Sequence, residues 1–287
     1  MRDSTGILCM AYGSPASGSE IEEYYTHIRH GRPPSPAALA DLRERYEAIG
    51  GSPLERITRA QAAALAERTE LPTFVGMKHA PPFIAEGAGA AREAGIRRLI
   101  GLPLAPHFAA MSLGQYEADL QKAWPGELVF IPGFHAHPAF IETIAGLLRE
   151  AMAGYPADHV FFTAHSLPER ILREGDGYRD RLLESCALVA AGVDLPPWSF
   201  AFQSASRTGE PWLGPDLIEA LAESGTQRAL VCPIGFVADH LEVLYDIDVE
   251  AQAFARERGI ELRRTPSLND RPEFIAALAA IVEEAAR

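Results

Sequence analysis

The feature that most constrains the fold is a regular alternation of short apolar runs with longer segments typical of helices. The runs are rich in aliphatic residues, whereas the segments between them are rich in Ala, Leu, Glu and Arg. Strand–helix alternation of this kind predicts parallel sheets with helices on both faces. The expected strands are residues 6–11, 73–77, 98–104 and 128–132 in a first series, and 159–164, 199–203, 228–234 and 261–265 in a second.

The two series resemble each other in sequence. Residues 98–104 (RLIGLPL) align with residues 228–234 (RALVCPI), and residues 137–141 (HPAFI) align with residues 271–275 (RPEFI). The latter pair places Pro near the start of an Ala- and Leu-rich segment, where proline favours the first turn of a helix. Two matches in the same order indicate a duplicated unit. The sequence therefore predicts an α/β protein with two Rossmann-like domains, a boundary near residue 150 and a cleft between the halves.

The first domain, residues 1–150, is longer than the second, residues 151–287, at one place. The step from the end of its first strand to the end of its second strand contains about 28 extra residues, which is too many for an ordinary connection. The surplus lies in residues 24–54, a segment with tyrosines, arginines and prolines. Insertions beyond the carboxyl end of a parallel strand usually serve ligand binding. We therefore expect this segment to form part of a binding site.

Composition disfavours several classes of protein and of site. The net charge of −13 disfavours nucleic acid as a partner, because phosphate contacts need clustered Lys and Arg. No apolar run is long enough to span a membrane, and the first apolar stretch is too short for a signal peptide, so we expect a cytoplasmic protein. The cysteines, Cys9, Cys186 and Cys232, are too few for an iron–sulfur cluster and are expected to be buried. We expect no tightly bound cofactor.

Aromatic and ionisable residues are concentrated at the expected carboxyl ends of the strands, where open α/β sheets bind ligands. A single histidine at such a position is often only structural, and that explanation is stronger for His79 and His107 than for His165. No glycine-rich phosphate loop, G-x-S-x-G motif or closed zinc motif is present, which disfavours nucleotide binding, an α/β hydrolase and a structural zinc site. The strand-end residues are Tyr12, Lys78, His79, His107, His165, Gln203 and the segment 235–242.

A row of acidic residues follows the strand expected at 228–234. Asp239, Glu242, Asp246 and Glu250 are three or four positions apart, which places them along one face of a helix. Such a row is usually a solvated helix face. Here its neighbours are apolar and it begins at the end of a strand, so we favour a partly buried functional row.

The motifs, taken together and in order, resemble those of the ferrochelatases, and most closely the bacterial type that uses coproporphyrin. The resemblance covers residues 6–281 and implies a class II chelatase, a lyase of haem biosynthesis that inserts Fe²⁺ into a porphyrin. The motifs are MAYG at 10–13, YYTHIR at 24–29, RYEAIGG at 45–51, LAPHF at 104–108, AHSLPE at 164–169, WLGP at 212–215 and GFVADHLEVLYD at 235–246.

The resemblance also implies roles for single residues. It assigns iron binding or proton transfer to His165 and Glu242, and it places Tyr12 against the porphyrin as an axial ligand of the product iron. A base is needed because two pyrrole N–H protons must leave, and His is suited to this near neutral pH. Asp239, Asp246 and Glu250 form a candidate track for the cation or the protons. Contacts with the macrocycle and its propionates are assigned to Arg29, Arg45, Tyr46, Ser52 and Tyr116.

The expected substrate is coproporphyrin III, which has four propionates where protoporphyrin IX has two. Arg29, Arg32, Arg43 and Arg45 make the extra segment locally basic, and arginine pairs well with carboxylates. Acidic residues alternate with Arg43 and Arg45, so a solvated helix also explains those two. The residues are also compatible with a protoporphyrin IX ferrochelatase, a cobalt or sirohydrochlorin chelatase, and a haem- or porphyrin-binding protein without catalysis. We expect a monomer that transiently contacts the next enzyme of haem biosynthesis.

Overall fold

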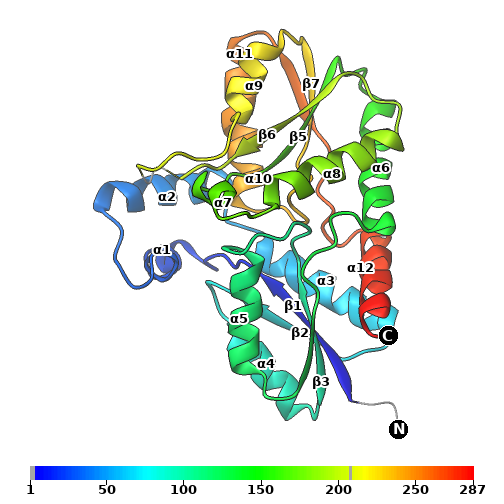
Figure 1. Cartoon of the computed structure of the whole chain (residues 1–287). Coiled ribbons are helices and arrows are strands. Elements are labelled where there is room, and N and C mark those ends of the chain that lie inside the picture. The colour runs from blue at the N-terminus through cyan, green and yellow to red at the C-terminus, as the bar shows by residue number, and fades with distance from the viewer. Residues whose placement is uncertain (1–3, 207–208) are drawn as a thin grey trace.

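The computed structural model describes residues 4–206 and 209–287, which form two parallel β-sheets covered by helices (Figure 1). The strand orders are β2-β1-β3-β4 and β6-β5-β7-β8, and neighbouring strands in each sheet are parallel. The strands are β1 (Thr5–Ala11), β2 (Thr73–Met77), β3 (Arg98–Pro103), β4 (Glu127–Phe130), β5 (His159–His165), β6 (Trp198–Gln203), β7 (Arg228–Cys232) and β8 (Glu261–Arg264).

The matching strand orders confirm the predicted α/β fold of two Rossmann-like halves. Every expected strand is present, and its ends differ from the prediction by no more than two residues. Strands were predictable here because both faces of a parallel sheet are buried, so their sequences are nearly continuous apolar runs. In β1, for example, the four residues from Ile7 to Met10 are fully buried.

Helices connect the strands and cover both sheets. The connection between β1 and β2 is the longest in the first half, as expected, and its helices α1 and α2 extend sideways from the body of the molecule (Figure 1). The helices are η1 (Gly18–Glu20), α1 (Ile21–Ile28), α2 (Pro36–Ala48), α3 (Leu54–Thr69), α4 (Ile84–Glu93), α5 (Leu113–Ala123), α6 (Pro138–Ala153), α7 (Arg170–Arg173), α8 (Tyr178–Ala191), α9 (Leu217–Ser224), α10 (Leu241–Leu244), the π-helix η2 (Asp246–Ala251), α11 (Gln252–Glu257) and α12 (Pro272–Ala285).

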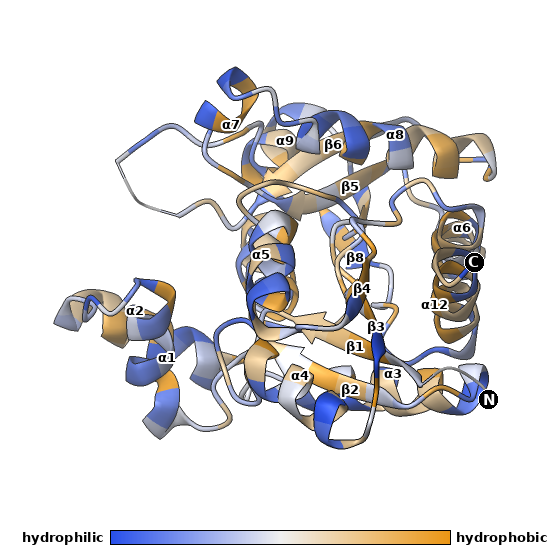
Figure 2. Ribbon diagram, turned by 60° about the horizontal axis from the view of Figure 1, so that its bottom comes forward, coloured by the Kyte–Doolittle hydropathy of each residue, from blue (hydrophilic) through white to orange (hydrophobic). Residues whose placement is uncertain are grey.

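The last helix of each half packs across the molecule. Helix α6 follows β4 but contacts α8 and α12, and α12 follows β8 but contacts α3 of the first half. Figure 2 shows α6 and α12 side by side, with much of their surface coloured as hydrophobic. One hydrophobic cluster accordingly includes Ile7 of β1, Phe162 of β5 and Leu278 of α12. Residue 150, the expected boundary, lies inside α6. It separates the two sequence repeats, but the two halves share one hydrophobic cluster.

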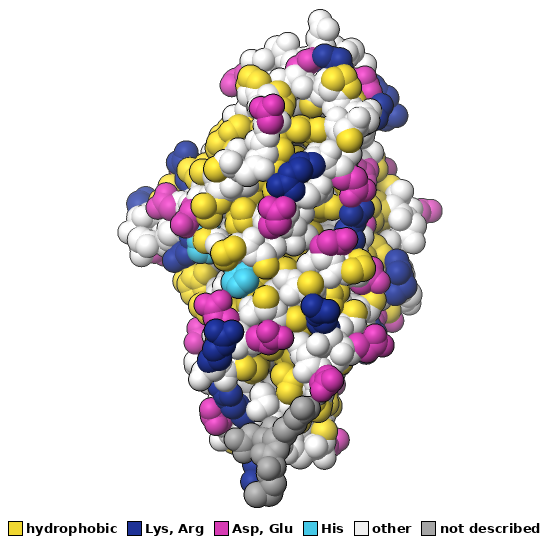
Figure 3. All heavy atoms as spheres, turned by 90° about the vertical axis from the view of Figure 1, so that its right-hand side faces the viewer, with side chains coloured by type: hydrophobic (Ala, Val, Ile, Leu, Met, Phe, Trp, Pro, Cys, Tyr) yellow, Lys and Arg dark blue, Asp and Glu magenta, His cyan; other side chains and the backbone are white. Residues whose placement is uncertain are grey.

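The cysteines lie in the interior, and the charged side chains lie on the surface. Cys9, Cys186 and Cys232 are buried and free, as expected. Burial raises the pKa of the Cys9 thiol to about 12, so this thiol stays protonated. On the side of the molecule in Figure 3, acidic and basic side chains are interspersed rather than gathered by sign. Within the described residues no helix is both long and apolar enough to cross a membrane.

Candidate active site

His165 and Glu242 form a hydrogen-bonded pair beyond the ends of two neighbouring strands. His165 is the last residue of β5, and Glu242 lies in the short helix α10, which the chain reaches soon after β7. His165 Nδ1 lies 2.9 Å from Glu242 Oε2. A carboxylate only accepts hydrogen bonds, so Nδ1 carries the proton and the neutral ring keeps its lone pair on Nε2. Both side chains are about 30% exposed, which leaves the pair accessible to a ligand.

Backbone carbonyls anchor this pair from both sides. The Tyr178 hydroxyl donates to the His165 carbonyl at 3.0 Å, and Gln203 Nε2 donates to the Glu242 carbonyl at 2.9 Å. His240 Nδ1 lies 3.0 Å from the Ala238 carbonyl, which fixes the ring with Nε2 facing Glu242 Oε2 at 3.6 Å. Partners that orient a histidine in this way fix both its tautomer and its position.

Electrostatics keep Glu242 ionised and make His165 more basic. Burial alone would raise the pKa of Glu242, but His165 and His240 outweigh it and hold that pKa well below its usual range. Burial alone would lower the pKa of His165, but the nearby charge of Glu242 outweighs it and raises that pKa. The imidazole is therefore a better proton acceptor than an unpaired buried histidine would be.

The acidic row is shorter than the sequence predicted. Asp246 Oδ2 accepts a hydrogen bond from Ser204, and its other oxygen lies 3.7 Å from Arg45 Nη1 of α2. Arg45 Nη2 lies 3.9 Å from Glu250 Oε1, so one guanidinium bridges both acids. Burial, followed by Glu242 and Glu250, raises the pKa of Asp246 to about 7. A proton on this group at neutral pH relieves the repulsion that a row of carboxylates creates.

Asp239 does not belong to this row, and the expectation that all four acids share one helix face is wrong for it. It precedes α10, and its carboxylate is turned toward the segment after β8. Oδ1 accepts hydrogen bonds from Ser267 at 2.7 Å and from Arg264 at 3.2 Å, and Oδ2 accepts one from Asn269 at 2.8 Å. Asp239 thus holds the loop before α10 in place.

Tyr12 comes from the first half and belongs to the same site. It follows β1 and is 42% exposed, although its neighbours are buried. Burial and then the charge of Glu242 raise its pKa, so the two side chains are within electrostatic reach across the halves. The Tyr12 ring lies 4.6 Å from the ring of His79, whose Nδ1 is 3.0 Å from His27 Nδ1 of α1. His79 thus connects Tyr12 to His27 of the extra segment.

The chain is similar to known proteins over nearly its whole length. The family model described as Ferrochelatase matches residues 4–286, which is nearly the whole chain. The chain belongs to the ferrochelatase family. This agrees with the resemblance that the motifs indicated.

Curated ferrochelatases match over nearly their full length. The chain is 41% identical to the ferrochelatase of Herpetosiphon aurantiacus, with 98% of this chain and 99% of that protein covered. It is also 41% identical to the coproporphyrin III ferrochelatase of Halalkalibacterium halodurans, with 97% and 96% covered. Among solved structures, SirB from Bacillus subtilis with Fe³⁺ has a TM-score of 0.63 at 13% identity, with 98% of this chain and 95% of SirB covered. The likeness to SirB supports the fold alone.

The residues expected to contact porphyrin have different surroundings in the structure. Tyr46 is buried against Tyr24, and burial and Glu242 raise the pKa values of both. Tyr116 is buried in the core of the first half. Ser52 Oγ accepts a hydrogen bond from the Leu54 amide at the start of α3, and Arg29 Nε donates to the Arg32 carbonyl. Arg45 is the most constrained, because it pairs with acids on both sides.

Several residues at the site carried no assigned role in the sequence prediction. Gln203 and Tyr178 donate hydrogen bonds to backbone carbonyls, and such contacts have no sequence signature. Gln203 was expected at a strand end, but without a role. His107 has the structural role that was the stronger expectation for it, because it is buried and its Nε2 lies 2.9 Å from Ser185 Oγ. Within residues 4–206 and 209–287, no three His, Cys, Asp or Glu side chains are grouped so that they could hold a metal ion.

Proposed function

We propose that this member of the ferrochelatase family is a coproporphyrin III ferrochelatase, which inserts Fe²⁺ into coproporphyrin III and releases two protons in haem biosynthesis. The observation that carries the proposal is the hydrogen-bonded His165–Glu242 pair beyond the ends of β5 and β7. Relatives that are called coproporphyrin III ferrochelatases are about as similar to the chain as those called ferrochelatases. The arginines that follow α1, Arg29 and Arg32, and those on α2, Arg43 and Arg45, support a substrate with several carboxylates.

His165 is the proposed base. Its Nε2 carries a lone pair because Nδ1 donates to Glu242, and this lone pair accepts a proton from a pyrrole N–H. The positive charge that forms on the ring is stabilised by the Glu242 carboxylate at 2.9 Å. Once the proton has moved to solvent, Nε2 is free to accept the second one.

Fe²⁺ is a substrate in this reaction rather than a resident cofactor. An imidazole and a carboxylate bind Fe²⁺ less tightly than a closed set of four ligands would, which allows the ion to move on to the four porphyrin nitrogens. Tyr12 is the proposed axial ligand on the other face of the ring. Asp246 and Glu250 are the proposed cation or proton track. Asp239 is not part of it, because its carboxylate is bound by Arg264, Ser267 and Asn269. The cytoplasmic location, the monomeric state and the contact with a following enzyme remain predictions from the sequence.

The test is the absorbance change when coproporphyrin III and Fe²⁺ are mixed anaerobically with catalytic amounts of protein. We expect H165A and E242A each to lower kcat by about a hundredfold or more, since each removes part of the proton acceptor. H137A is the matched control, because His137 is a histidine at the start of α6 that is 20% exposed and also has a carboxylate partner, Glu284, at 3.4 Å. A porphyrin-binding protein without catalysis would bind the ring tightly but would show no insertion above background, and H165A would change nothing.

The same assay separates the remaining substrates. Protoporphyrin IX and sirohydrochlorin are offered with Fe²⁺ or Co²⁺ under the same conditions. A higher kcat/KM for either ring than for coproporphyrin III would show that the proposed substrate is wrong, although the protein would still be a chelatase.

A further inference from the structure

Lys78 is a partly buried cation beside Tyr12 that forms no ion pair with any described residue. It directly follows β2, and its ammonium lies 6.0 Å from the centroid of the Tyr12 ring and 5.6 Å from that of Tyr116. Its hydrogen-bond acceptor is the side-chain oxygen of Gln115 on α5. Across residues 4–206 and 209–287, Lys78 forms no ion pair within 4.0 Å, and the nearby Asp119 pairs instead with Lys122 at 3.5 Å.

This arrangement is costly for the free protein. An ammonium group is strongly hydrated, so partial burial without an opposite charge destabilises it. The neutral amide of Gln115 can orient the ammonium but cannot neutralise it. In a chain with a net charge of −13, acidic side chains are abundant, yet Asp119, whose charge acts on Lys78, forms its ion pair with Lys122. A free positive charge in such a position is suited to an anionic group of a ligand.

The amino-terminal end of α5 adds to the positive potential. Gln115 lies in the first turn of this eleven-residue helix, and the residue before the helix, Ser112, makes no side-chain capping bond. The helix dipole is positive at this end. Lys78 and α5 therefore favour a carboxylate at the same place, next to Tyr12 and Tyr116.

We propose that Lys78 binds a carboxylate at the rim of the tetrapyrrole and is a specificity-determining residue. The proposal rests on the proposed function, in which the ring lies against Tyr12. The arginines of the extra segment lie on α2 or next to α1, whereas Lys78 follows β2 and is hydrogen-bonded to Gln115 of α5, so these cations come from separate elements (Figure 1). Coproporphyrin III carries a propionate on each of its four pyrroles, whereas the two of protoporphyrin IX are on neighbouring pyrroles. Cations on separate elements fit carboxylates spread around the whole rim, and Lys78 binds one that protoporphyrin IX lacks.

The experiment compares K78M with the wild type on both rings. We expect K78M to raise KM for coproporphyrin III about tenfold, the size of one lost charge-assisted hydrogen bond. Its kcat should stay nearly unchanged, because a contact made equally in the ground state and the transition state is lost. KM for protoporphyrin IX should hardly change. K78R, which keeps the charge, should behave like the wild type, and K78Q, which keeps polarity without charge, should behave like K78M.

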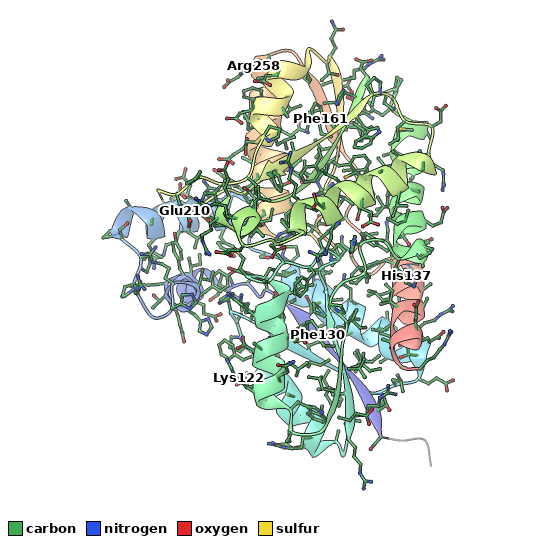
Figure 4. The ribbon with its side chains drawn as sticks, viewed as in Figure 1. Lys122, Phe130, His137, Phe161, Glu210 and Arg258 are labelled. Atoms are coloured by element: carbon green, nitrogen blue, oxygen red, sulfur yellow. The ribbon has the colours of Figure 1, made fainter. Side chains whose placement is uncertain are left out.

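K122M is the matched control, because it removes the same charge from an exposed position on α5, labelled in Figure 4. Equal changes in KM for both rings, or an unchanged KM for coproporphyrin III in both K78M and K78Q, would overturn the proposal. Quenching of coproporphyrin III fluorescence by the metal-free proteins measures the same contact without catalysis. Wild-type protein that binds the ring but inserts no iron would refute the proposed function, whereas weaker binding by K78Q would still support Lys78.

Discussion

At the scale of single residues, one hydrogen bond determines which nitrogen of His165 is available for chemistry. Glu242 accepts from Nδ1, which leaves the lone pair on Nε2. The same carboxylate raises the pKa of His165 against the effect of burial. Glu242 therefore has two effects that can be separated from iron binding, since both are properties of the metal-free protein.

E242Q removes the charge but keeps the shape of the side chain. We expect the pKa of His165 to fall, because burial then acts without an opposing negative charge. The acidic limb of the rate profile should move to lower pH in step, since the base must be neutral to accept a proton, while the maximal rate falls. NMR titration of the metal-free protein, with the His165 signal assigned from H165A, measures this directly.

The control for that titration is E284Q, which removes a carboxylate beside another histidine, His137. It should leave the His165 titration where it is in the wild type. A His165 pKa that is equal or higher in E242Q would show that Glu242 does not determine the basicity of the imidazole.

Sequence reasoning located the central residues but not the contacts that support them. His165, Glu242 and Tyr12 were found because each belongs to a recognisable motif at a strand end. The charge of Lys78 is visible in the sequence, but its lack of an ion pair depends on which side chains of α5 lie next to it. That information is tertiary, and no local pattern contains it.

At the scale of elements, Arg45 connects the extra segment of the first half to the π-helix of the second. Its guanidinium pairs with Asp41 on its own helix at 3.0 Å, and reaches Asp246 at 3.7 Å and Glu250 at 3.9 Å. It also lies 4.9 Å from the centroid of the Tyr245 ring. Several partly exposed contacts of this kind contribute only about 0.2–1 kcal/mol each.

R45M should therefore change local mobility more than global stability. We expect faster hydrogen exchange in α2 and in the segment 246–251, measured by mass spectrometry, with little change in the unfolding midpoint. R43M is the matched control, because Arg43 lies on the same helix and pairs with Glu22 of α1, which belongs to the same connection between β1 and β2. It should leave exchange in 246–251 unchanged. Unaltered exchange in that segment in R45M would show that α2 is not held by the acids.

The acidic row illustrates how far spacing alone can be used. The spacing of three and four residues assumed one continuous α-helix from the end of β7. In the structure, the chain from Pro233 to His240 forms no helix, and α10 then passes into a π-helix, in which the Glu250 amide donates to the Tyr245 carbonyl five residues earlier. Local spacing could not reveal this change of helix type.

At the scale of the whole molecule, the halves are joined by more than the active site. Sequence periodicity identified the strands and helices of both repeats, but it could not reveal which sheet each final helix covers, because an apolar helix face fits either. In the structure α12 packs against α3 of the first half as well as against α6. Gln61 of α3 adds a polar link, since its amide nitrogen donates to the carbonyls of Val237 and Asn269 in the second half.

This packing predicts that the two halves unfold together. Leu278 of α12 is fully buried in the cluster that the halves share, so L278A should lower the free energy of unfolding by about 2–5 kcal/mol. Variants that retain only Trp124, in the first half, or only Trp198, in the second, report each half by fluorescence in urea. Both should show one transition at the same midpoint, displaced equally by L278A, because a shared core transmits the loss to both sheets. E283A, at an exposed position on the same helix, should displace neither. If only one of the two midpoints moved, the halves would be independent units, and the crossed helices would not couple them.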